Sequence, residues 1–369
     1  MTSPRVLLSG GGTGGHIFPA VSIAQEIQKR YPDAQFLFIG ALGKMEMEKV
    51  PQAGFNIEGL EIAGFDRGNI FSNFKLPFKL INSVIKAKKI IKNFKPDFAI
   101  GTGGYASGPA LWAASQLGIP TFIQEQNSFP GVTNKILSKK AKAIFTAYPG
   151  MEKFFPNTQV YYFGNPIRQS VLENGIPSDV AKKEFALQNQ LTILSVGGSQ
   201  GSRTLNNGWL DNLQQLTEKG YQLIWQTGKL DYPQLSKNQE VSSLENISLN
   251  EFIFDMAKAY SAADIIVSRA GAIAISELEN IGKPVILVPL PTAAEDHQTK
   301  NAQSLVDQNA AFMVKDVEMK EKFWTSLEKL CSDTELRSKM SEELKKLGKP
   351  KATSDIVDQI LQLTGFNKI

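Results

Sequence analysis

The chain has 369 residues, of which 42% are hydrophobic and 21% charged, and its net charge is +4. This composition is typical of a folded globular protein, and the length favours two domains. A single cysteine, Cys331, excludes an internal disulfide and a cysteine-based zinc site, which favours a reducing compartment. No run reaches the roughly 18 apolar residues that span a bilayer, and no signal-peptide pattern precedes the first strand, so we expect a cytoplasmic protein.

The first predicted elements are a strand and a helix joined by glycines, in RVLLSGGGTGGHIFPA at residues 5–20. The helix is indicated by apolar residues at a helical period: Ile17, Ala20, Val21, Ala24 and Ile27. A glycine-rich turn at a helix N-terminus lets backbone N–H groups approach an anion. We therefore predict an anion-binding turn, and a tight turn that binds no ligand is the alternative.

The same turn matches the dinucleotide pattern G-x-G-x-x-G at Gly10, Gly12 and Gly15. A dinucleotide site also needs a carboxylate at the end of the second strand, about 20 residues further on, to bind the ribose. The second predicted strand, FLFIGALG, ends on Ile39 and Gly40 and offers no carboxylate. The sequence therefore disfavours a nicotinamide site.

Positive charge is concentrated in one stretch, residues 67–96, which holds eight basic residues and no acidic one. Helical spacing predicts an amphipathic helix that packs on its own domain through Leu80, Val84, Ala87, Ile91 and Phe94. Three phenylalanines precede this helix in a loop-like segment: Phe71, Phe74 and Phe78. Phenylalanines flanked by lysines suit an anionic membrane surface, and a solvated basic helix with its rings folded inward is the alternative.

Strand-like runs alternate with helical patterns along the whole chain, which predicts parallel sheets covered by helices. The first half contains VLLS, FLFIG, FAIG, TFIQ, AIFTA and VYYFG; the second contains TILSVGG, QLIWQTG, ISLNEFI, IIVSRAG, PVILVPL and AFMV. The second half has its own glycine-rich turn, VGGSQGSRTLNN, before a helix marked by Leu205, Trp209, Leu213 and Leu216. The predicted fold class is α/β, with two Rossmann-like domains.

Glycine and proline in GNPIRQSV, residues 164–171, interrupt the pattern and indicate the join between the domains. We expect domains at residues 1–163 and 164–345. The tail, residues 346–369, is predicted to form a helix that returns to the first domain. Because ligands of open α/β sheets bind at the carboxyl ends of the strands, we expect the two sheets to face each other across one cleft with two anion-binding turns.

Eight segments, in this order along the chain, resemble the MurG family of bacterial peptidoglycan glycosyltransferases. They are GGGTGGH (10–16), GTGGYASGP (101–109), QEQNSFPGVTNK (124–135), GNPIR (164–168), GGSQGSRTLN (197–206), FIFDMAKAY (252–260), SRAGAIAISE (268–277) and EDHQTKNA (295–302). Each segment is weakly diagnostic alone, but eight in series are highly specific.

The resemblance implies the two-domain GT-B architecture, with the acceptor on the N-terminal domain and the UDP-sugar on the C-terminal domain. The implied reaction moves N-acetylglucosamine from UDP-GlcNAc to the 4-hydroxyl of the N-acetylmuramoyl group of lipid I, with inversion, and gives lipid II. It implies no cofactor, no obligatory metal and peripheral attachment to the cytoplasmic side of the cell membrane. The sequence also lacks the Asp-x-Asp pattern of metal-dependent sugar-nucleotide sites. We expect no nucleic-acid partner, since this chemistry has no use for one.

For the donor, the start of a helix in SRAGAIAISE places backbone N–H groups where a diphosphate can bind. Glu277, one turn further on, is positioned to accept hydrogen bonds from the ribose hydroxyls, and a solvated surface glutamate is the alternative. The resemblance implies contributions from other segments, with Ile253 acting through its backbone. The implied donor residues are Arg168, Ser199, Ile253, Ala272, Ile273, Ala274, Ile275, Ser276, Glu277 and Gln298.

For the acceptor, His16 is the predicted general base, because a neutral imidazole can take a proton from an attacking hydroxyl. The alternative is a histidine that only satisfies backbone groups of the turn. Thr13, Gly14 and Gly15 are expected beside it, where the turn binds a phosphate of the lipid acceptor. Asn127 and Glu125 are the other polar candidates.

Two other functions remain open from the sequence. One is another GT-B protein that uses a UDP-sugar, such as a diacylglycerol glycosyltransferase or a UDP-GlcNAc epimerase. The other is a noncatalytic sugar-nucleotide sensor, which would keep the donor residues but would not need His16.

Overall fold

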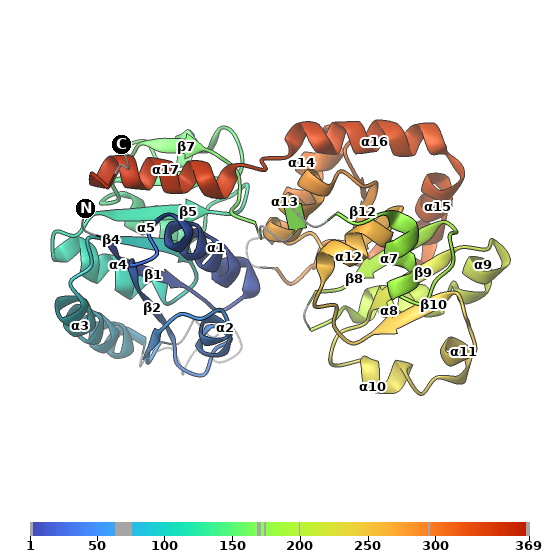
Figure 1. Ribbon diagram of the computed structural model, residues 1–369, viewed down its shortest axis with the longest axis horizontal. Coiled ribbons are helices and arrows are strands. Elements are labelled where there is room, and N and C mark those ends of the chain that lie inside the picture. The colour runs from blue at the N-terminus through green and yellow to red at the C-terminus, as the bar shows by residue number, and fades with distance from the viewer. Residues whose placement is uncertain are drawn as a thin grey trace. The chain divides into compact units, whose positions relative to one another are not determined.

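The computed structural model describes residues 3–62, 76–167, 171–172, 175–198, 200–293 and 296–366. The chain divides into two compact units, each with its own sheet (Figure 1). Unit 1 consists of Met1–Arg168 and Lys349–Ile369, and unit 2 of Gln169–Gly348. None of the described helices is both long enough and apolar enough to cross a membrane.

Among the described residues, unit 1 contains a seven-stranded sheet in the order β3-β2-β1-β4-β5-β6-β7, and every strand pair is parallel. The strands are β1 (Arg5–Gly10), β2 (Gln35–Ala41), β3 (Ile57–Leu60), β4 (Phe98–Gly103), β5 (Thr121–Glu125), β6 (Ala143–Thr146) and β7 (Val160–Tyr162). The helices are α1 (Gly14–Arg30), α2 (Glu46–Gln52), α3 (Leu76–Phe94), α4 (Ser107–Gln116), α5 (Val132–Ser138), the 3-10 helix η2 (Met151–Phe154) and α17 (Ala352–Thr364).

Successive residues of a strand face opposite sides of the sheet, and buried apolar residues lie on both sides here. Helices therefore cover both faces. Leu8 and Phe122 belong to a core cluster shared with α1 and α17, whereas Leu7 and Ile123 belong to a cluster shared with α3 and α4. The predicted apolar face of α1 is buried throughout. The C-terminal helix α17 lies beside α1 in Figure 1, and its Asp358 is bound by Arg30.

Unit 2 contains, among its described residues, a six-stranded parallel sheet in the order β10-β9-β8-β11-β12-β13. The strands are β8 (Thr192–Val196), β9 (Gln222–Gln226), β10 (Ile247–Asn250), β11 (Ile265–Ser268), β12 (Val285–Leu287) and β13 (Phe312–Met313). The helices are α7 (Ser178–Glu184), α8 (Arg203–Leu210), α9 (Leu213–Glu218), α10 (Tyr232–Leu235), α11 (Gln239–Ser242), α12 (Met256–Ala262), α13 (Ala272–Ile281), α14 (His297–Val306), the 3-10 helix η4 (Asp316–Glu318), α15 (Met319–Ser332) and α16 (Thr334–Leu347).

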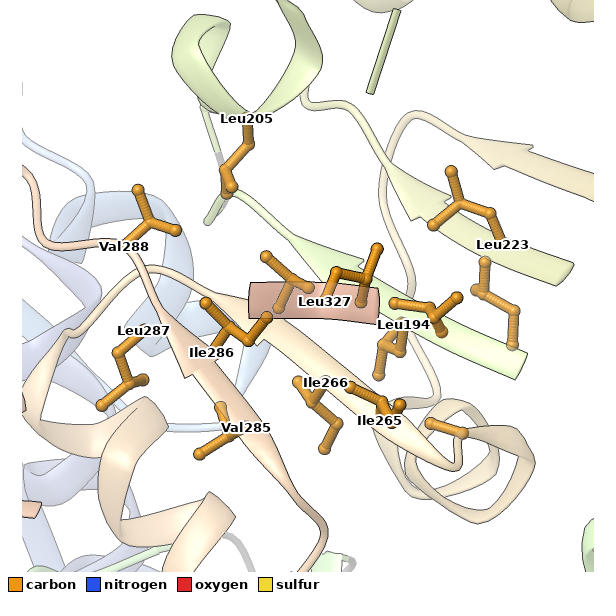
Figure 2. Packing of buried hydrophobic residues seen from close by; sticks show 14 of the residues in the cluster. Leu194, Leu205, Leu223, Ile265, Ile266, Val285, Ile286, Leu287, Val288 and Leu327 are labelled. Atoms are coloured by element: carbon orange, nitrogen blue, oxygen red, sulfur yellow. The ribbon is translucent and has the colours of Figure 1, made fainter. Parts of the chain in front are cut away.

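The core of unit 2 is one buried cluster that joins the central strands to the helices around them. Figure 2 shows part of this cluster, in which Leu194 of β8 and Ile286 of β12 lie with Leu327 of α15. The predicted α/β class, with two Rossmann-like domains built on parallel sheets, is confirmed.

The structure corrects three local expectations. The single helix predicted over residues 205–216 is in fact two helices, α8 and α9. In a continuous helix the backbone N–H of Asn212 would donate to the Gly208 carbonyl, but the side-chain amide of Asn212 donates to that carbonyl instead. Leu80, expected on the packing face of its helix, is 52% exposed. Strand β3 was not predicted, since its four residues IEGL carry little apolar pattern.

Candidate active site

Both sheets have a reversal of strand order, between β1 and β4 in unit 1 and between β8 and β11 in unit 2. Ligands of open α/β sheets bind outside the carboxyl ends of the strands at such a point. The predicted residues Thr13 to His16 follow β1, and Ala272 to Glu277 follow β11. Each unit therefore gathers its predicted residues at the edge where this fold binds ligands.

The turn after β1 presents the start of α1 with unbonded amides. Thr13 is the N-cap, in an extended conformation and without a side-chain capping bond. In the described part of the chain, no acceptor is found for the N–H groups of Thr13, Gly14 and Gly15. Three such amides at the positive end of a 17-residue helix form a site for an anion.

A buried carboxylate, Glu46 at the start of α2, lies behind this turn. Its Oε2 accepts the Gly12 N–H at 2.9 Å, and its Oε1 accepts the Ala41 N–H at 3.0 Å. The side chain is fully buried. The Gly12 amide is therefore already engaged, which limits the anion site to the amides from Thr13 onward. Sequence reasoning missed Glu46 because it looked for a carboxylate only at the end of β2.

A second glycine turn, after β4, packs directly on the first one. Gly104 has a φ of +83°, and a Cβ there would lie 2.2 Å from the Gly11 carbonyl oxygen. The Thr102 hydroxyl donates to the His16 carbonyl oxygen at 2.6 Å, and the Gly11 N–H donates to the Gly103 carbonyl oxygen. These contacts fix the backbone from which His16 projects.

The imidazole of His16 is half-buried and bonded through Nδ1. Nδ1 lies 3.1 Å from the Gly11 carbonyl oxygen and 3.2 Å from the Thr13 hydroxyl. Gly103 borders the other side of the ring, since a Cβ there would lie 3.0 Å from Nε2. His16 thus lies beside the amides of Thr13, Gly14 and Gly15, with its Nδ1 turned back to the glycine turn.

Glu125, at the end of β5, is unsuited to act as a base. It is 1% exposed, and each carboxylate oxygen accepts two hydrogen bonds, from the Asn127 backbone and side chain and from Gly131 and Asn134. Burial raises the pKa of Glu125, and these four hydrogen bonds oppose the rise. With every acceptor position filled, Glu125 anchors the loop that carries Asn127 instead of presenting a lone pair to a substrate.

In unit 2, the start of α13 resembles the start of α1. Gly271 is the N-cap, extended and without a side-chain capping bond. The N–H groups of Ile273 and Ala274 have no acceptor among the described residues. Two amides at the positive end of this helix offer a second anion site.

Glu277, on the same helix, is 4% exposed, which contradicts the alternative of a solvated surface glutamate. The hydroxyl of Tyr260, on α12, donates to Glu277 Oε2 at 3.1 Å. Sequence reasoning did not single out Tyr260, because a tyrosine on a helix carries no local signal of such a bond.

Two further predicted residues border this edge of unit 2. The Ile253 N–H donates to the side-chain oxygen of Gln226, so its carbonyl is the backbone group left for a ligand. Gln298 accepts the Leu290 N–H at 2.9 Å through Oε1, which orients its NH₂ group.

Two other predicted donor residues, Ser199 and Arg168, lie outside the described residues. In the same turn as Ser199, the Ser202 hydroxyl caps α8 by accepting the Leu205 N–H.

A partly buried ion pair stiffens the turn after β11. Arg269 binds Asp316 at 2.5 Å and donates to the carbonyl oxygens of Val288 and Pro289. Asp316 also accepts the Thr204 hydroxyl at 2.7 Å. The pair links the turn before α13 to α8 and β12, and its partners are too far apart in the sequence to have been predicted.

Two family models match the chain: the glycosyltransferase family 28 N-terminal domain over residues 6–146 and the C-terminal domain over residues 192–359. A protein of Bacteroides thetaiotaomicron is 50% identical over 363 residues, which are 97% of each chain. A protein of Cytophaga hutchinsonii is 49% identical over 365 residues, 99% of this chain and 98% of its own. Both are named UDP-N-acetylglucosamine--N-acetylmuramyl-(pentapeptide) pyrophosphoryl-undecaprenol N-acetylglucosamine transferase.

Solved structures agree with this relationship. The crystal structure of Acinetobacter baumannii MurG superimposes with a TM-score of 0.77 at 32% identity, over 97% of this chain and 99% of that one. A UDP complex of S. aureus MnaA has a TM-score of 0.71 at 13% identity, over 99% and 98% of the two chains, which shows a shared fold alone. The chain therefore belongs to the MurG family of N-acetylglucosamine transferases, within glycosyltransferase family 28.

Proposed function

We propose that this glycosyltransferase moves N-acetylglucosamine from UDP-GlcNAc to the 4-hydroxyl of the N-acetylmuramoyl group of lipid I, and so forms lipid II. The observation that carries the proposal is a pair of helix starts at the switch points of the two sheets, one followed by His16 and the other by the buried Glu277. The names of the relatives supply the substrates.

Unit 2 is the proposed donor domain. The amides at the start of α13 hold the diphosphate, and Ile275 and Ser276 carry the helix on to Glu277, which accepts the ribose hydroxyls. The Ile253 carbonyl accepts from uracil, and the oriented NH₂ group of Gln298 donates to a sugar hydroxyl. Arg168 and Ser199 are assigned to the donor by family resemblance only.

Unit 1 is the proposed acceptor domain. The amides of Thr13, Gly14 and Gly15 bind a phosphate of the lipid diphosphate, since they are the unengaged donors of the turn. Asn127, whose backbone and side chain donate to Glu125, is the residue that we assign to the acceptor sugar. Transfer requires that both sets of residues meet around the two substrates.

His16 is the proposed catalytic residue. As its imidazole takes the proton of the acceptor 4-hydroxyl, that oxygen attacks the anomeric carbon, and the bond to UDP breaks on the opposite face. The configuration inverts through a state with oxocarbenium character. The diphosphate charge that develops is stabilised by the oriented amides and the dipole of α13.

We also propose that unit 1 attaches to an anionic membrane surface. Three apolar side chains of α3 are more than half exposed: Leu80, Ile81 and Ile85. The same helix carries the exposed lysines Lys79, Lys86, Lys89 and Lys92. Lys88 Nζ lies 5.4 Å from the ring centroid of Trp112, which is 40% exposed on α4. Phe71 and Phe74 lie outside the described residues, as does the side chain of Phe78. Apolar groups among lysines suit an interface with anionic headgroups.

Sedimentation with vesicles tests this attachment. Binding to anionic vesicles should weaken with salt and with Leu80, Ile81 and Ile85 changed to Ser, and likewise with Phe71, Phe74 and Phe78 changed to Ser. Equal recovery with neutral and anionic vesicles, or no effect of either set of substitutions, would refute it.

The reaction itself is tested with sugar-labelled UDP-GlcNAc and purified lipid I, with and without EDTA. The proposal expects label in the lipid product only when lipid I is present, and no loss of rate with EDTA. Conversion of UDP-GlcNAc to another free nucleotide sugar without an acceptor would instead indicate an epimerase. Binding of UDP-GlcNAc without any turnover would indicate a sensor.

A further inference from the structure

One peptide unit of the first glycine turn lies between a carboxylate and the His16 ring. The N–H of Gly12 donates to Glu46 Oε2 at 2.9 Å, and the carbonyl oxygen of Gly11 lies 3.1 Å from His16 Nδ1. The N–H and the C=O belong to the same planar amide, which joins Gly11 to Gly12. Glu46 and His16 therefore bind opposite ends of one conjugated group.

The carbonyl at this contact decides which imidazole nitrogen carries the proton. A carbonyl oxygen only accepts hydrogen bonds, so the 3.1 Å contact requires a proton on Nδ1. The Thr13 hydroxyl oxygen, 3.2 Å from Nδ1, can accept the same proton as a second partner. The neutral ring then has its lone pair on Nε2.

The negative charge of Glu46 makes the Gly11 carbonyl oxygen a stronger hydrogen-bond acceptor. Its carboxylate accepts from two backbone amides, those of Gly12 and Ala41, and the side chain is fully buried. A bond from N–H to a carboxylate in a region of low dielectric is strong, and it polarises the amide so that more negative charge lies on the oxygen. The Gly11 oxygen thus holds the Nδ1 proton more firmly than an ordinary carbonyl does.

Two glycines, Gly11 and Gly40, leave the space that the Glu46 side chain occupies. A Cβ on Gly11 would lie 2.1 Å from Glu46 Oε1, and a Cβ on Gly40 would lie 2.6 Å from Glu46 Cγ. Any side chain at either position would displace Glu46 from the turn. The two glycines therefore serve the placement of Glu46 as well as the conformation of the backbone.

We propose that Glu46 is a positioning residue for His16, which acts through the Gly11–Gly12 peptide to hold the ring and its Nδ1–H tautomer, so that Nε2 takes the proton. The arrangement resembles a carboxylate–histidine pair with one peptide inserted between the partners. The inference rests on the proposed role of His16 as general base, and it adds a residue that acts without touching substrate.

The tautomer can be measured directly by nitrogen NMR of protein labelled with ¹⁵N-histidine. The chain has only two histidines, so a His297→Gln variant assigns the His16 signals. In the neutral ring of the wild type we expect a protonated Nδ1 and an unprotonated Nε2. Glu46→Gln keeps the shape but removes the charge and one of the two acceptor oxygens, so we expect the population to shift toward Nε2–H.

Activity supplies the second readout. Changing the hydrogen-bond partner that orients a metal-binding histidine typically costs 10- to 100-fold, and we expect kcat of Glu46→Gln to fall by roughly the same factor. The KM for UDP-GlcNAc should stay within about twofold, since Glu46 lies in unit 1. Val50→Ala is the matched control, because Val50 is fully buried on the same helix and contributes to the core. That variant should lower stability yet keep the wild-type tautomer and kcat.

An Nε2–H tautomer in the wild type would overturn the proposal, even if Glu46→Gln failed to fold. A tautomer unchanged in a folded Glu46→Gln protein would overturn the role of Glu46. The spectra need no substrate, so they decide this proposal separately from the transfer assay and the His16 variant, which decide the proposed function.

Discussion

The helix starts of α1 and α13 are built alike but differ in where each places its carboxylate. At α1, Glu46 lies behind the turn and binds the Gly12 amide, and a histidine follows the glycines. At α13, Glu277 lies on the helix itself and is bonded by a tyrosine hydroxyl. The same strand–turn–helix unit thus carries its carboxylate behind the turn in one case and on the helix in the other, and the proposed function assigns the first to proton transfer and the second to the sugar nucleotide.

The largest expected effect comes from removing the histidine at α1. His16→Ala should lower kcat by roughly 10²–10⁴-fold, the usual worth of a general base. UDP binding should change little, because that ligand is assigned to unit 2. Steady-state kinetics with lipid I measures it. Activity within a few-fold of wild type would make His16 structural and direct attention to Asn127.

The next effect comes from the carboxylate at α13. Glu277→Ala should raise the KM for UDP-GlcNAc by at least about 100-fold, since it removes two charged hydrogen bonds of about 1.5–3 kcal/mol each. Folding should be less affected, as judged by thermal unfolding. An unchanged KM would remove Glu277 from the donor site.

Glycine substitutions test whether the two turns differ in how well they tolerate a side chain. Gly104→Ala should destabilise unit 1 by at least about 1–3 kcal/mol, because φ is +83° and a Cβ would meet the Gly11 carbonyl. Gly271→Ala should cost no more than about 1 kcal/mol, the penalty for alanine at an N-cap, because a Cβ there meets nothing within 4 Å and the backbone is extended. Chemical denaturation of both variants checks this, and equal midpoints would mean that the turns are equally tolerant.

The smallest effect is expected at the partner of Glu277. Tyr260→Phe removes one hydroxyl that donates to the Glu277 carboxylate but leaves the carboxylate in place for the ribose. It should therefore weaken UDP binding by only about 2- to 10-fold, less than the loss of the charged hydrogen bonds themselves. Direct binding measurements detect a change of this size. A loss as large as that of Glu277→Ala would show that Tyr260 contacts the ligand itself.

The strand–helix alternation predicted both parallel sheets, because β-branched runs and helical spacing are local properties of the sequence. The same local signals predicted that His16 and Glu277 each follow a strand, and they lie on α1 after β1 and on α13 after β11. They could not find Glu46, Tyr260 or the Arg269–Asp316 pair, since each acts on a partner from a different element. They also could not show that Glu125 has no acceptor position left, which depends on four donors in the folded loop.

The start of α13 is assigned to donor binding, and the start of α1 carries the proposed base. The affinity for UDP tests this assignment most directly, measured by calorimetry on the wild type, His16→Ala and Glu277→Ala. We predict that His16→Ala binds UDP like the wild type while Glu277→Ala binds it at least about 100-fold more weakly, because two charged hydrogen bonds are lost. A His16→Ala protein that loses UDP affinity, or a Glu277→Ala protein that keeps it, would contradict the assignment of donor binding to unit 2.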